Sequence, residues 1–334
     1  MKIPKAEQLP SGNWRCRVTI NGNRVSFIKE EEQAAVNAAM LAMLSTNPNE
    51  DERKEKLSSI TLRSAVQDYI DKRENILSPS TLKSYDSILR NRLQGIMDLP
   101  LTARIDWQAV LNDEAEEISA KTLKNVWGLI NGVLNEYDIS AGKVRLPQVV
   151  RVKRPFLQPK EIKTFVKAVK GHKYELPYLL CLHGLRRSEM LALTKKDVTK
   201  DTICVRGAVV QNIDGEYIRK DENKNPSSRR NVPVMLPRVY QLAKNSKTDV
   251  LCPWKPSTMH KPLNDLCKSA GITVVSLHDL RRSYASLCYH LGVSEAQTME
   301  WGGWSDASTM RKIYIQIAEQ DRIKKAEELK KYFR

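Results

Sequence analysis

Five short segments in the C-terminal half of the chain combine residue types that suit chemistry on a phosphate group. In chain order they are His183-Gly184-Leu185-Arg186-Arg187-Ser188-Glu189, Lys224-Asn225-Pro226-Ser227-Ser228-Arg229-Arg230, His278-Asp279-Leu280-Arg281, Gly303-Trp304-Ser305 and Ile313-Tyr314-Ile315. A transferring phosphoryl group spreads negative charge over its oxygens, and fixed cationic donors stabilise that charge. Two guanidiniums, a lysine and an imidazole can supply such donors, which leaves Tyr314 as the nucleophile.

Arg186 and Arg281 are the candidates for binding phosphate oxygens. Arg186 follows a Gly-Leu step at the break in an apolar helix, and a planar guanidinium pairs bidentately with phosphate. His278 and Arg281 are three residues apart, so a helix places both on one face, where His278 can donate to an oxygen or move a proton. This spacing favours Arg281 over Arg282. The ordinary alternatives are a surface Arg186 paired with Glu189, and a structural His278.

Tyr314 and Trp304 also have ordinary alternatives. The pKa of a free tyrosine is about 10, so attack at neutral pH needs a base or a cationic setting that favours phenolate. A cluster of arginines can provide that setting. An isolated tyrosine between Ile313 and Ile315 is more often a core residue. Trp304 offers one indole N–H and a large packing face, and its default role is to fill a core.

The positive charge of the chain lies in its C-terminal half. The 334 residues carry 55 Lys and Arg against 39 Asp and Glu, a formal net charge of +16. Residues 1–150 are balanced, with 20 basic and 20 acidic side chains, so residues 151–334 hold the whole excess. So uneven a charge indicates a polyanionic partner, with DNA or RNA as the first candidate. A solvated lysine-rich surface is the alternative for residues 322–334 taken alone.

The spacing of the cysteines and the hydropathy of the chain exclude several classes of protein. None of the six cysteines forms a C-x-x-C pair, so neither structural zinc nor a disulfide framework is expected, and no metal site is predicted. The first ten residues lack an apolar core, and no stretch has the length needed to span a bilayer. We expect a soluble cytoplasmic protein with no membrane partner.

The N-terminal segment, residues 1–48, predicts a β-β-α unit. One strand is expected to bury alternate residues, namely Trp14, Cys16, Val18 and Ile20. Asn21-Gly22 is typical of a hairpin turn, and an alanine-rich helix over 29–44 follows the second strand. The arginines that could enter a groove of DNA from the exposed face are Arg15, Arg17 and Arg24. The equally good alternative is that they form the solvated side of a small sheet. A linker is expected over 49–60.

The next segment, residues 61–140, predicts a small helical bundle. Three stripes of apolar residues begin at Leu62, at Leu82 and at Leu123, with Ser80 and Ser119 as caps of the second and third helices. The basic residues that could contact DNA phosphates are Lys83, Lys121 and Lys124, although surface charge on helices usually serves only solubility. Residues 141–155, with two prolines, predict an extended linker.

Residues 156–334 predict a mixed α/β domain. Helices are expected over 159–169 and over 176–193, the second interrupted at Gly184, and strands over 202–211, 216–219 and 230–235. The chain after residue 237 is mostly helical. Arg229 and Arg230 fall near a strand connection, where side chains can reach outward, and are candidate DNA contacts. The whole chain is therefore expected to be multidomain and mainly α, with small β-sheets.

The five segments together resemble the motifs of the tyrosine recombinase (phage integrase) family. The resemblance covers residues from about 156 to the C-terminus, and the order and spacing of the segments make it specific. On pattern alone, residues 61–140 look like the core-type DNA-binding domain of that family, and residues 1–48 like its arm-type domain. No segment is convincing by itself, and the inference depends on their combination.

The resemblance implies a site-specific recombinase of a temperate phage or an integrative or conjugative element. Tyr314 would attack a scissile phosphodiester and form a 3′-phosphotyrosyl link. Arg186 and Arg281 would hold the non-bridging oxygens, Lys224 would protonate the leaving 5′ oxygen, and His278 would assist proton transfer. No metal, ATP or other cofactor is implied. The implied partners are double-stranded DNA attachment sites, three further copies of the chain in a tetramer, an excisionase and a host DNA-bending protein.

Two positions depart from the commoner family pattern. Trp304 stands where many members carry His, a variant also found in the family. Asn225-Pro226 follows Lys224 in place of the commoner Thr-Lys, so Lys220 is the second candidate for the lysine. Two alternative functions remain at this point: relaxation of supercoils by a type IB topoisomerase, and DNA binding by a regulator that keeps the fold without catalysis.

Overall fold

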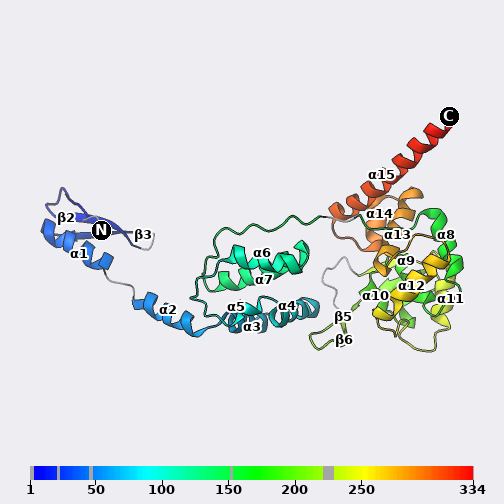
Figure 1. Ribbon diagram of the computed structural model, residues 1–334, viewed down its shortest axis with the longest axis horizontal. Helices are drawn as coiled ribbons and strands as arrows, with labels where there is room; N and C mark the ends of the chain where they lie inside the picture. Colours follow the sequence, from blue (N-terminus) through cyan, green and yellow to red (C-terminus); the bar gives the residue numbers. More distant parts are fainter. Residues whose placement is uncertain (1–3, 21–22, 45–47, 151–152, 221–228, 334) are drawn as a thin grey trace. The chain divides into compact units, whose positions relative to one another are not determined.

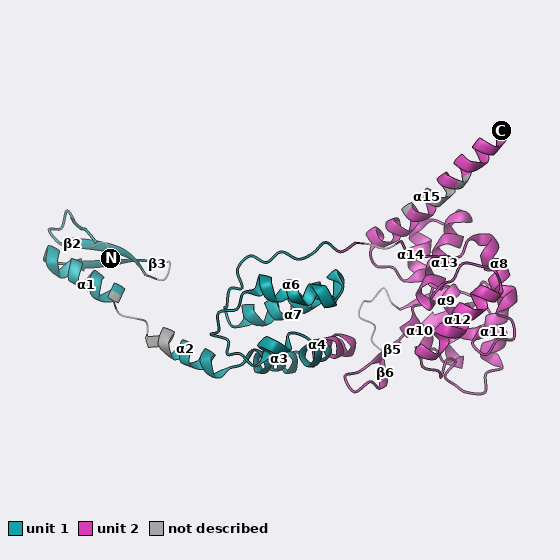
Figure 2. Cartoon of the chain, viewed as in Figure 1, with its two compact units in different colours: residues 1–76, 85–148 teal, residues 77–84, 149–334 magenta. Residues whose placement is uncertain are grey.

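The computed structural model describes residues 4–20, 23–44, 48–150, 153–220 and 229–333. Helices dominate the chain, and its sheets are small and antiparallel (Figure 1). This confirms the predicted mainly α, multidomain architecture. The chain forms two compact units, one of residues 1–76 and 85–148 and the other of residues 77–84 and 149–334 (Figure 2).

The first unit begins with a three-stranded antiparallel sheet and one helix. The elements are β1 (Ala6–Gln8), β2 (Trp14–Ile20), β3 (Asn23–Lys29) and α1 (Glu32–Leu44), with strand order β1-β2-β3. The predicted alternation is confirmed, because Cys16 and Val18 are buried against Ala35 and Ala39 of α1. Strand β1 is an addition, since three residues are too few to show a period of two. The predicted Asn21-Gly22 turn lies outside the described residues.

The polar segment predicted as a linker forms helix α2 (Pro48–Ser59). Its sequence is rich in Glu, Lys and Arg, which are strong helix formers. Arg53 anchors the helix within the unit. Its Nη2 donates to the carbonyl oxygen of Tyr137 at 2.9 Å and lies 3.3 Å from Oδ2 of Asp138.

The helical bundle has five helices among the described residues, two more than the three expected. They are α3 (Leu62–Asp71), α4 (Pro79–Asn91), α5 (Gln94–Met97), α6 (Trp107–Glu117) and α7 (Ala120–Glu136). The predicted apolar stripes form its core, with Leu62, Val66, Leu123, Val126, Ile130 and Leu134 buried. Ser119 caps α7 as predicted, whereas Ser78 and not Ser80 accepts a hydrogen bond from a backbone N–H, that of Thr81, at 3.3 Å.

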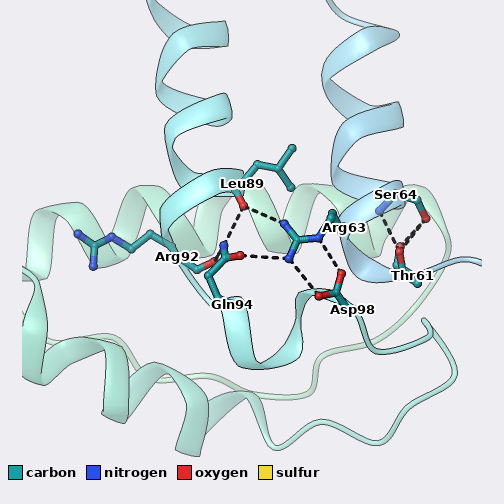
Figure 3. A network of polar contacts seen from close by, with 7 residues as sticks. All are labelled: Thr61, Arg63, Ser64, Leu89, Arg92, Gln94 and Asp98. Atoms are coloured by element: carbon teal, nitrogen blue, oxygen red, sulfur yellow. Dashed lines mark hydrogen bonds and ion pairs between the residues drawn. The ribbon is translucent and has the colours of Figure 1, made fainter.

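Arg63 joins α3 to α5 and to Asp98, the residue that follows α5 (Figure 3). Its Nε and Nη2 donate to the two carboxylate oxygens of Asp98 at 2.7 and 3.2 Å, and Nη2 also donates to Gln94. Gln94 in turn donates to the carbonyl oxygens of Leu89 and Arg92, both at 2.9 Å. These bonds satisfy the carbonyl groups at the end of α4, which no helical N–H can reach.

The second unit is built around a buried helix, α9 (Glu175–Leu182), all of whose residues are buried. It packs against α10 (Arg187–Ala192), α11 (Pro237–Lys244) and α13 (Leu277–His290). The remaining helices are α8 (Pro159–Ala168), α12 (Ser257–Ser269), α14 (Glu295–Gly302), α15 (Ala307–Tyr332) and a short 3₁₀ turn, Lys195–Asp197. The predicted break at Gly184 is confirmed. None of the described helices is both long and apolar enough to cross a membrane.

Two strand pairs lie beside this helical core. They are β4 (Thr202–Val205) with β7 (Arg230–Pro233), and β5 (Ala208–Gln211) with β6 (Tyr217–Lys220), both antiparallel. The single strand expected over 202–211 is therefore two strands with different partners, separated at Arg206 and Gly207. Strand β7, which begins with Arg230, also packs on α14, the helix that precedes Gly303 and Trp304.

Candidate functional site

A tight turn between α9 and α10 places Arg186. The turn depends on Gly184, whose φ of +86° favours glycine, and a Cβ there would lie 2.8 Å from the ring of Tyr284. Arg186 is the N-cap residue of α10, and its backbone N–H donates to Oε2 of Glu189 at 2.7 Å. The side chain of Arg186 is 34% exposed, so the part next to the backbone is held within the protein while the guanidinium reaches the surface.

Glu189 is the centre of a buried charge cluster. Its side chain is 2% exposed and contacts three guanidiniums. Nη1 of Arg186 donates to Oε1 at 2.5 Å, Nη1 and Nη2 of Arg230 donate to Oε1 and Oε2 at 3.0 and 2.9 Å, and Nη1 of Arg281 lies 3.8 Å from Oε2. Glu189 therefore pairs with two further arginines besides Arg186, the partner that the sequence suggested.

The cluster shifts the pKa of its members in opposite directions. Burial disfavours the charged form of Glu189, but the hydrogen bonds from Arg230 and the charges of Arg230, Arg186 and Arg281 outweigh it, and the pKa of Glu189 falls to about 2. For Arg281, burial and the charge of Arg186 lower the pKa to about 9, against the attraction of Glu189. At neutral pH the cluster therefore holds three positive charges and one negative charge.

Arg281 and Trp304 contact each other directly. Arg281 is 2% exposed, its Nη1 donates to the carbonyl oxygen of Gly184 at 2.9 Å, and its guanidinium carbon lies 4.1 Å from the ring centroid of Trp304. The indole of Trp304 also lies nearly parallel to the ring of Tyr284, with 6.5 Å between the centroids and an interplanar angle of 5°. The Gly303 carbonyl oxygen accepts a hydrogen bond from Nη2 of Arg186, so the turn before α15 is tied to α10.

His278 lies at the start of α13, which Ser276 and Asp279 cap reciprocally with a hydroxyl-to-carboxylate bond of 2.6 Å. Its ring is exposed, whereas Arg281 is buried, so the two residues share a helix but have different surroundings. Desolvation by the surrounding protein, followed by the charge of Arg281, lowers the pKa of His278 below its ordinary value of 6.5. The imidazole is therefore neutral at pH 7.

A cationic groove of about 690 Å³ opens beside this cluster. The residues that line it are Arg154, Arg186, Arg187, Ser188, His260, Ser276, Leu277, His278 and Arg282. Among these described lining residues there is no carboxylate. A concave surface with four guanidiniums and two imidazoles suits a phosphodiester. Sequence reasoning found only Arg186 and His278 in this set, because Arg154 lies in the extended segment and the others occupy positions without a distinctive spacing.

Tyr314 does not line this groove. It lies on α15 and packs with Met310, Ile313 and Ile317 of that helix, and its ring meets Tyr289 of α13 at 5.2 Å and 66°. The hydroxyl is buried and makes no hydrogen bond to any part of the chain that the structure describes. Burial raises the pKa of Tyr314, an effect that the nearby Thr298 partly opposes.

The other predicted site residues lie as follows. Lys224 falls in 221–228, outside the described residues, and Lys220 ends β6 with its side chain half-buried. Arg15 and Arg17 both pair with Glu7 of β1, while Arg24, Lys121, Lys124 and Arg229 are exposed and Lys83 is half-buried. Arg230, expected to reach outward to DNA, is 4% exposed and points into the charge cluster. A shift of one residue along a strand decides this difference, because successive side chains face opposite sides, and the sequence does not show the register.

The cysteine, histidine and acidic side chains that the structure describes do not form an evident metal site. All six cysteines are free. Within the described ranges, no three His, Cys, Asp or Glu side chains are grouped closely enough to hold a metal ion.

Residues 155–321, half of the chain, match the model of the phage integrase family. No curated protein sequence matches the chain. Among solved structures, the Tn1549 transposon integrase in complex with transposon right end DNA is 18% identical with a TM-score of 0.63, over 80% of this chain and 100% of that one. A lambda integrase dimer bound to a COC′ core site is 16% identical with a TM-score of 0.58, over 93% and 94% of the two chains. At these identities the likeness is one of fold.

Proposed function

The chain belongs to the phage integrase family, and on this premise we propose that it is a site-specific DNA recombinase that integrates and excises a mobile element. Its substrate would be double-stranded DNA carrying attachment sites. The observation that carries the proposal is the assembly of Arg186, Arg281 and Trp304 around Glu189, next to a groove lined by cations. The two solved integrases of similar fold were both captured on DNA.

In the proposed reaction Tyr314 attacks a scissile phosphodiester. The bond from its phenolic oxygen to phosphorus forms as the bond from phosphorus to the 5′ oxygen breaks, which leaves a 3′-phosphotyrosyl link and a 5′-hydroxyl. Lys224 donates the proton that the leaving oxygen takes up, and His278, neutral at pH 7, assists transfer of the phenolic proton. The reverse attack by a 5′-hydroxyl of a second DNA restores the phosphodiester. Because the phosphotyrosyl bond conserves the energy of the broken bond, neither ATP nor a metal is required.

Arg186 and Arg281 stabilise the charge that develops on the non-bridging oxygens. Arg186 is the arginine of the pair that lines the groove, so it would contact the phosphate first. Its Nη2 would exchange the Gly303 carbonyl oxygen for a phosphate oxygen. Trp304 offers its face to Arg281 and its single N–H to the phosphate.

The proposed reaction requires Tyr314 to leave its buried position. Tyr314 packs among residues of α13, α14 and α15 and is not one of the residues that line the groove. The described arrangement is therefore a resting state in which the nucleophile is protected and protonated, since burial raises its pKa. Binding of DNA would have to stabilise a second position of the N-terminal part of α15.

We further propose that the two N-terminal segments bind DNA outside the cleavage site. Residues 1–48 would act as an arm-type domain with Arg15, Arg17 and Arg24 on its sheet, and residues 61–140 as a core-type domain with Lys83, Lys121 and Lys124. Residues 156–334 would form the catalytic domain, with Arg229 at its DNA surface, and residues 49–60 and 141–155 would connect the three. Four copies would assemble on two DNA sites through α15, whose Ile323, Leu329 and Phe333 are all at least 60% exposed. An excisionase and a host DNA-bending protein are the proposed accessory partners.

Covalent trapping on a nicked suicide substrate tests the proposal. Wild-type protein should form a protein–DNA adduct on its attachment site, and Tyr314→Phe should form none while binding the same DNA. Plasmids with and without attachment sites separate the alternatives. Relaxation of both plasmids without recombination would support a topoisomerase, and DNA binding without any adduct would support a regulator.

A further inference from the structure

Arg230 is a buried arginine that the proposed reaction does not use. It begins β7, and its side chain is 4% exposed, whereas the neighbouring Arg229 is exposed. It does not line the groove. A buried guanidinium needs charged and hydrogen-bonding partners, because burying an unpaired cation is strongly unfavourable.

The partners of Arg230 lie on two different helices. Two of its nitrogens bind both carboxylate oxygens of Glu189 on α10, at 3.0 and 2.9 Å. Its Nε donates to the carbonyl oxygen of Trp301, near the end of α14, at 2.6 Å. Arg230 therefore connects the helix that presents Arg186 with the helix whose end leads into Gly303, Trp304 and α15.

Gly303 makes room for this connection. A Cβ at Gly303 would lie 2.7 Å from Nη1 and 2.8 Å from the guanidinium carbon of Arg230, closer than van der Waals contact allows. The carbonyl oxygen of the same residue accepts a hydrogen bond from Arg186. The turn after α14 is thus shaped around two guanidiniums, one of which faces the groove.

The bidentate bond of Arg230 to Glu189 has a consequence for Arg186. To bind a phosphate, Arg186 must give up contacts that it now makes within the protein, and Nη1 of Arg186 is bound to Oε1 of Glu189. Without another counter-ion, that exchange would leave a buried carboxylate without a strong partner, which is unfavourable. Arg230 binds both oxygens of Glu189, so Arg186 can turn to a phosphate while Glu189 stays neutralised.

We propose that Arg230 is a positioning residue of the cleavage site: it neutralises Glu189 and ties it to the end of α14, which frees Arg186 to bind the scissile phosphate. This assignment rests on the proposed function for its role in cleavage. It differs from the sequence-based prediction that Arg230 contacts DNA. Arg230 acts on the phosphate through Glu189 and Arg186 and touches neither DNA nor the reacting atoms.

The matched test compares two arginine–carboxylate pairs in the same unit. Arg230→Met and Arg230→Lys remove or weaken the bond to Glu189. Arg238→Met is the control, because Arg238 makes an equally bidentate bond to buried Glu175, at 2.7 and 3.0 Å, away from the groove. Two quantities are measured for each variant: the rate of single-turnover adduct formation at saturating DNA, and the DNA dissociation constant. Both are measured from about pH 5 to about pH 8.

Arg230→Met should slow adduct formation by roughly 10- to 100-fold, as loss of an outer partner of a reactive site does, with little change in DNA affinity. Arg230→Lys should recover part of the rate. With Arg230 gone, burial raises the pKa of Glu189 while Arg186 and Arg281 remain to lower it, so the acid limb of the rate profile should move to higher pH in Arg230→Met alone. A mere loss of stability would not move that limb. Equal rates in wild type and Arg230→Met, or equal losses in Arg230→Met and Arg238→Met, would overturn the assignment.

A second pair of variants keeps the inference testable if Arg230→Met does not fold. Gly303→Ala adds the Cβ that clashes with Arg230, and should reproduce the slow cleavage. Gly292→Ala is its control, because Gly292 also has a positive φ, +72°, but open space around it. Both carry a similar backbone strain, of about 1–2 kcal/mol. Cleavage equally fast in the two alanine variants would contradict the assignment.

Phosphate binding separates this inference from the proposed function. Inorganic phosphate is titrated into wild type and Arg230→Lys and followed by ³¹P NMR. If wild-type protein forms no DNA adduct, the proposed function fails, yet weaker phosphate binding in Arg230→Lys than in wild type would still support the role of Arg230 in freeing Arg186. Equal phosphate affinities would refute that role whether or not the protein cleaves DNA.

Discussion

The guanidinium of Arg281 lies over the indole of Trp304, with its central carbon 4.1 Å from the ring centroid. Arg281 is buried, and a cation–π interaction with a cation removed from water is worth about 2 kcal/mol. It fixes the orientation of Arg281 together with the hydrogen bond to Gly184. Trp304 thus supports the arginine proposed to bind phosphate, and it also packs near Tyr284.

Replacement of Trp304 should reveal this support. Trp304→Phe keeps an aromatic face for Arg281 but removes the indole N–H, and Trp304→Ala removes both. Adduct formation should fall in the order wild type, Phe, Ala, by roughly 30-fold for Ala if about 2 kcal/mol is lost. Trp254→Phe is the control, because the indole of Trp254 meets the ring of Tyr174 edge-on. Equal rates in the Phe and Ala variants would show that the aromatic face does not matter.

Neutralising either proposed phosphate ligand should be more damaging. Arg186→Ala or Arg281→Ala removes stabilisation of the transition state of roughly 3 kcal/mol, which corresponds to about a 100-fold slower cleavage. Arg281→Ala should also lower the melting temperature, since it leaves buried Glu189 with fewer partners. Rates measured with saturating nicked DNA decide the matter, and a wild-type rate in Arg281→Ala would refute its assignment.

Tyr314→Phe should fold at least as stably as wild type. The hydroxyl that it removes is buried and makes no hydrogen bond within the described ranges, so its removal relieves a desolvated polar group. Thermal unfolding in the absence of DNA checks this expectation. A melting temperature several degrees lower would mean that the hydroxyl has a partner in the resting state, and the position assigned to it would then be wrong.

His183 should make the stability of the second unit depend on pH. Its ring is fully buried, Nδ1 lies 2.7 Å from the Leu179 carbonyl oxygen, and Nε2 accepts from the backbone N–H groups of Met235 and Leu236 at 3.2 and 3.3 Å. Burial lowers the pKa of His183 to about 4, and the bond to Leu179 only partly opposes this. Protonation would end the acceptor role of Nε2.

The sign of this effect follows from proton linkage. Between pH 6.5 and about 4 the unfolded chain binds a proton at His183 that the native state does not, so the free energy of unfolding falls as the pH falls through this window. The full effect is about 3 kcal/mol. Denaturant unfolding across this range should show the loss in wild type and a smaller one in His183→Gln. Parallel curves for the two proteins would exclude His183 as the cause.

DNA binding should weaken steeply with salt, because each neutralised phosphate releases a counterion. Lys121 and Lys124 are exposed on the first turns of α7. If both contact phosphates, Lys121→Gln combined with Lys124→Gln should reduce the slope of log affinity against log salt by about 2. Lys72→Gln is the control, since Lys72 pairs with Asp68 and Glu136. An unchanged slope in the double variant would remove these lysines from the interface.

The sequence predicted those parts of the site that depend on local spacing. Gly184 interrupts an apolar run, which indicates a turn, and Arg186, Arg281 and Trp304 occur in motifs whose order is specific. Apolar periodicity likewise located α3 and α7, because burial of one face is recorded in every third or fourth residue. Strand β1 and helix α2 were missed, one too short and the other too polar to show a period.

What the sequence could not supply is the direction of individual side chains. Arg229 and Arg230 are adjacent and chemically identical, yet one is exposed and the other is buried against Glu189. In a strand, successive side chains face opposite sides, and which side is buried depends on pairing with a distant segment, here β4. The burial of the Tyr314 hydroxyl is likewise set by contacts with α13 and α14 and not by its neighbours Ile313 and Ile315.

Helix α15 runs without interruption from Ala307 to Tyr332 and carries Tyr314 near its beginning. At a rise of 1.5 Å per residue, the distance along the axis from Tyr314 to Tyr332 is about 27 Å. An unbroken helix of this length behaves as a stiff rod. A grip on its exposed end would therefore act as a torque on the end that holds Tyr314. If Tyr314 is the nucleophile, as proposed, whatever holds the far end of the rod would govern mechanically how readily one molecule reacts.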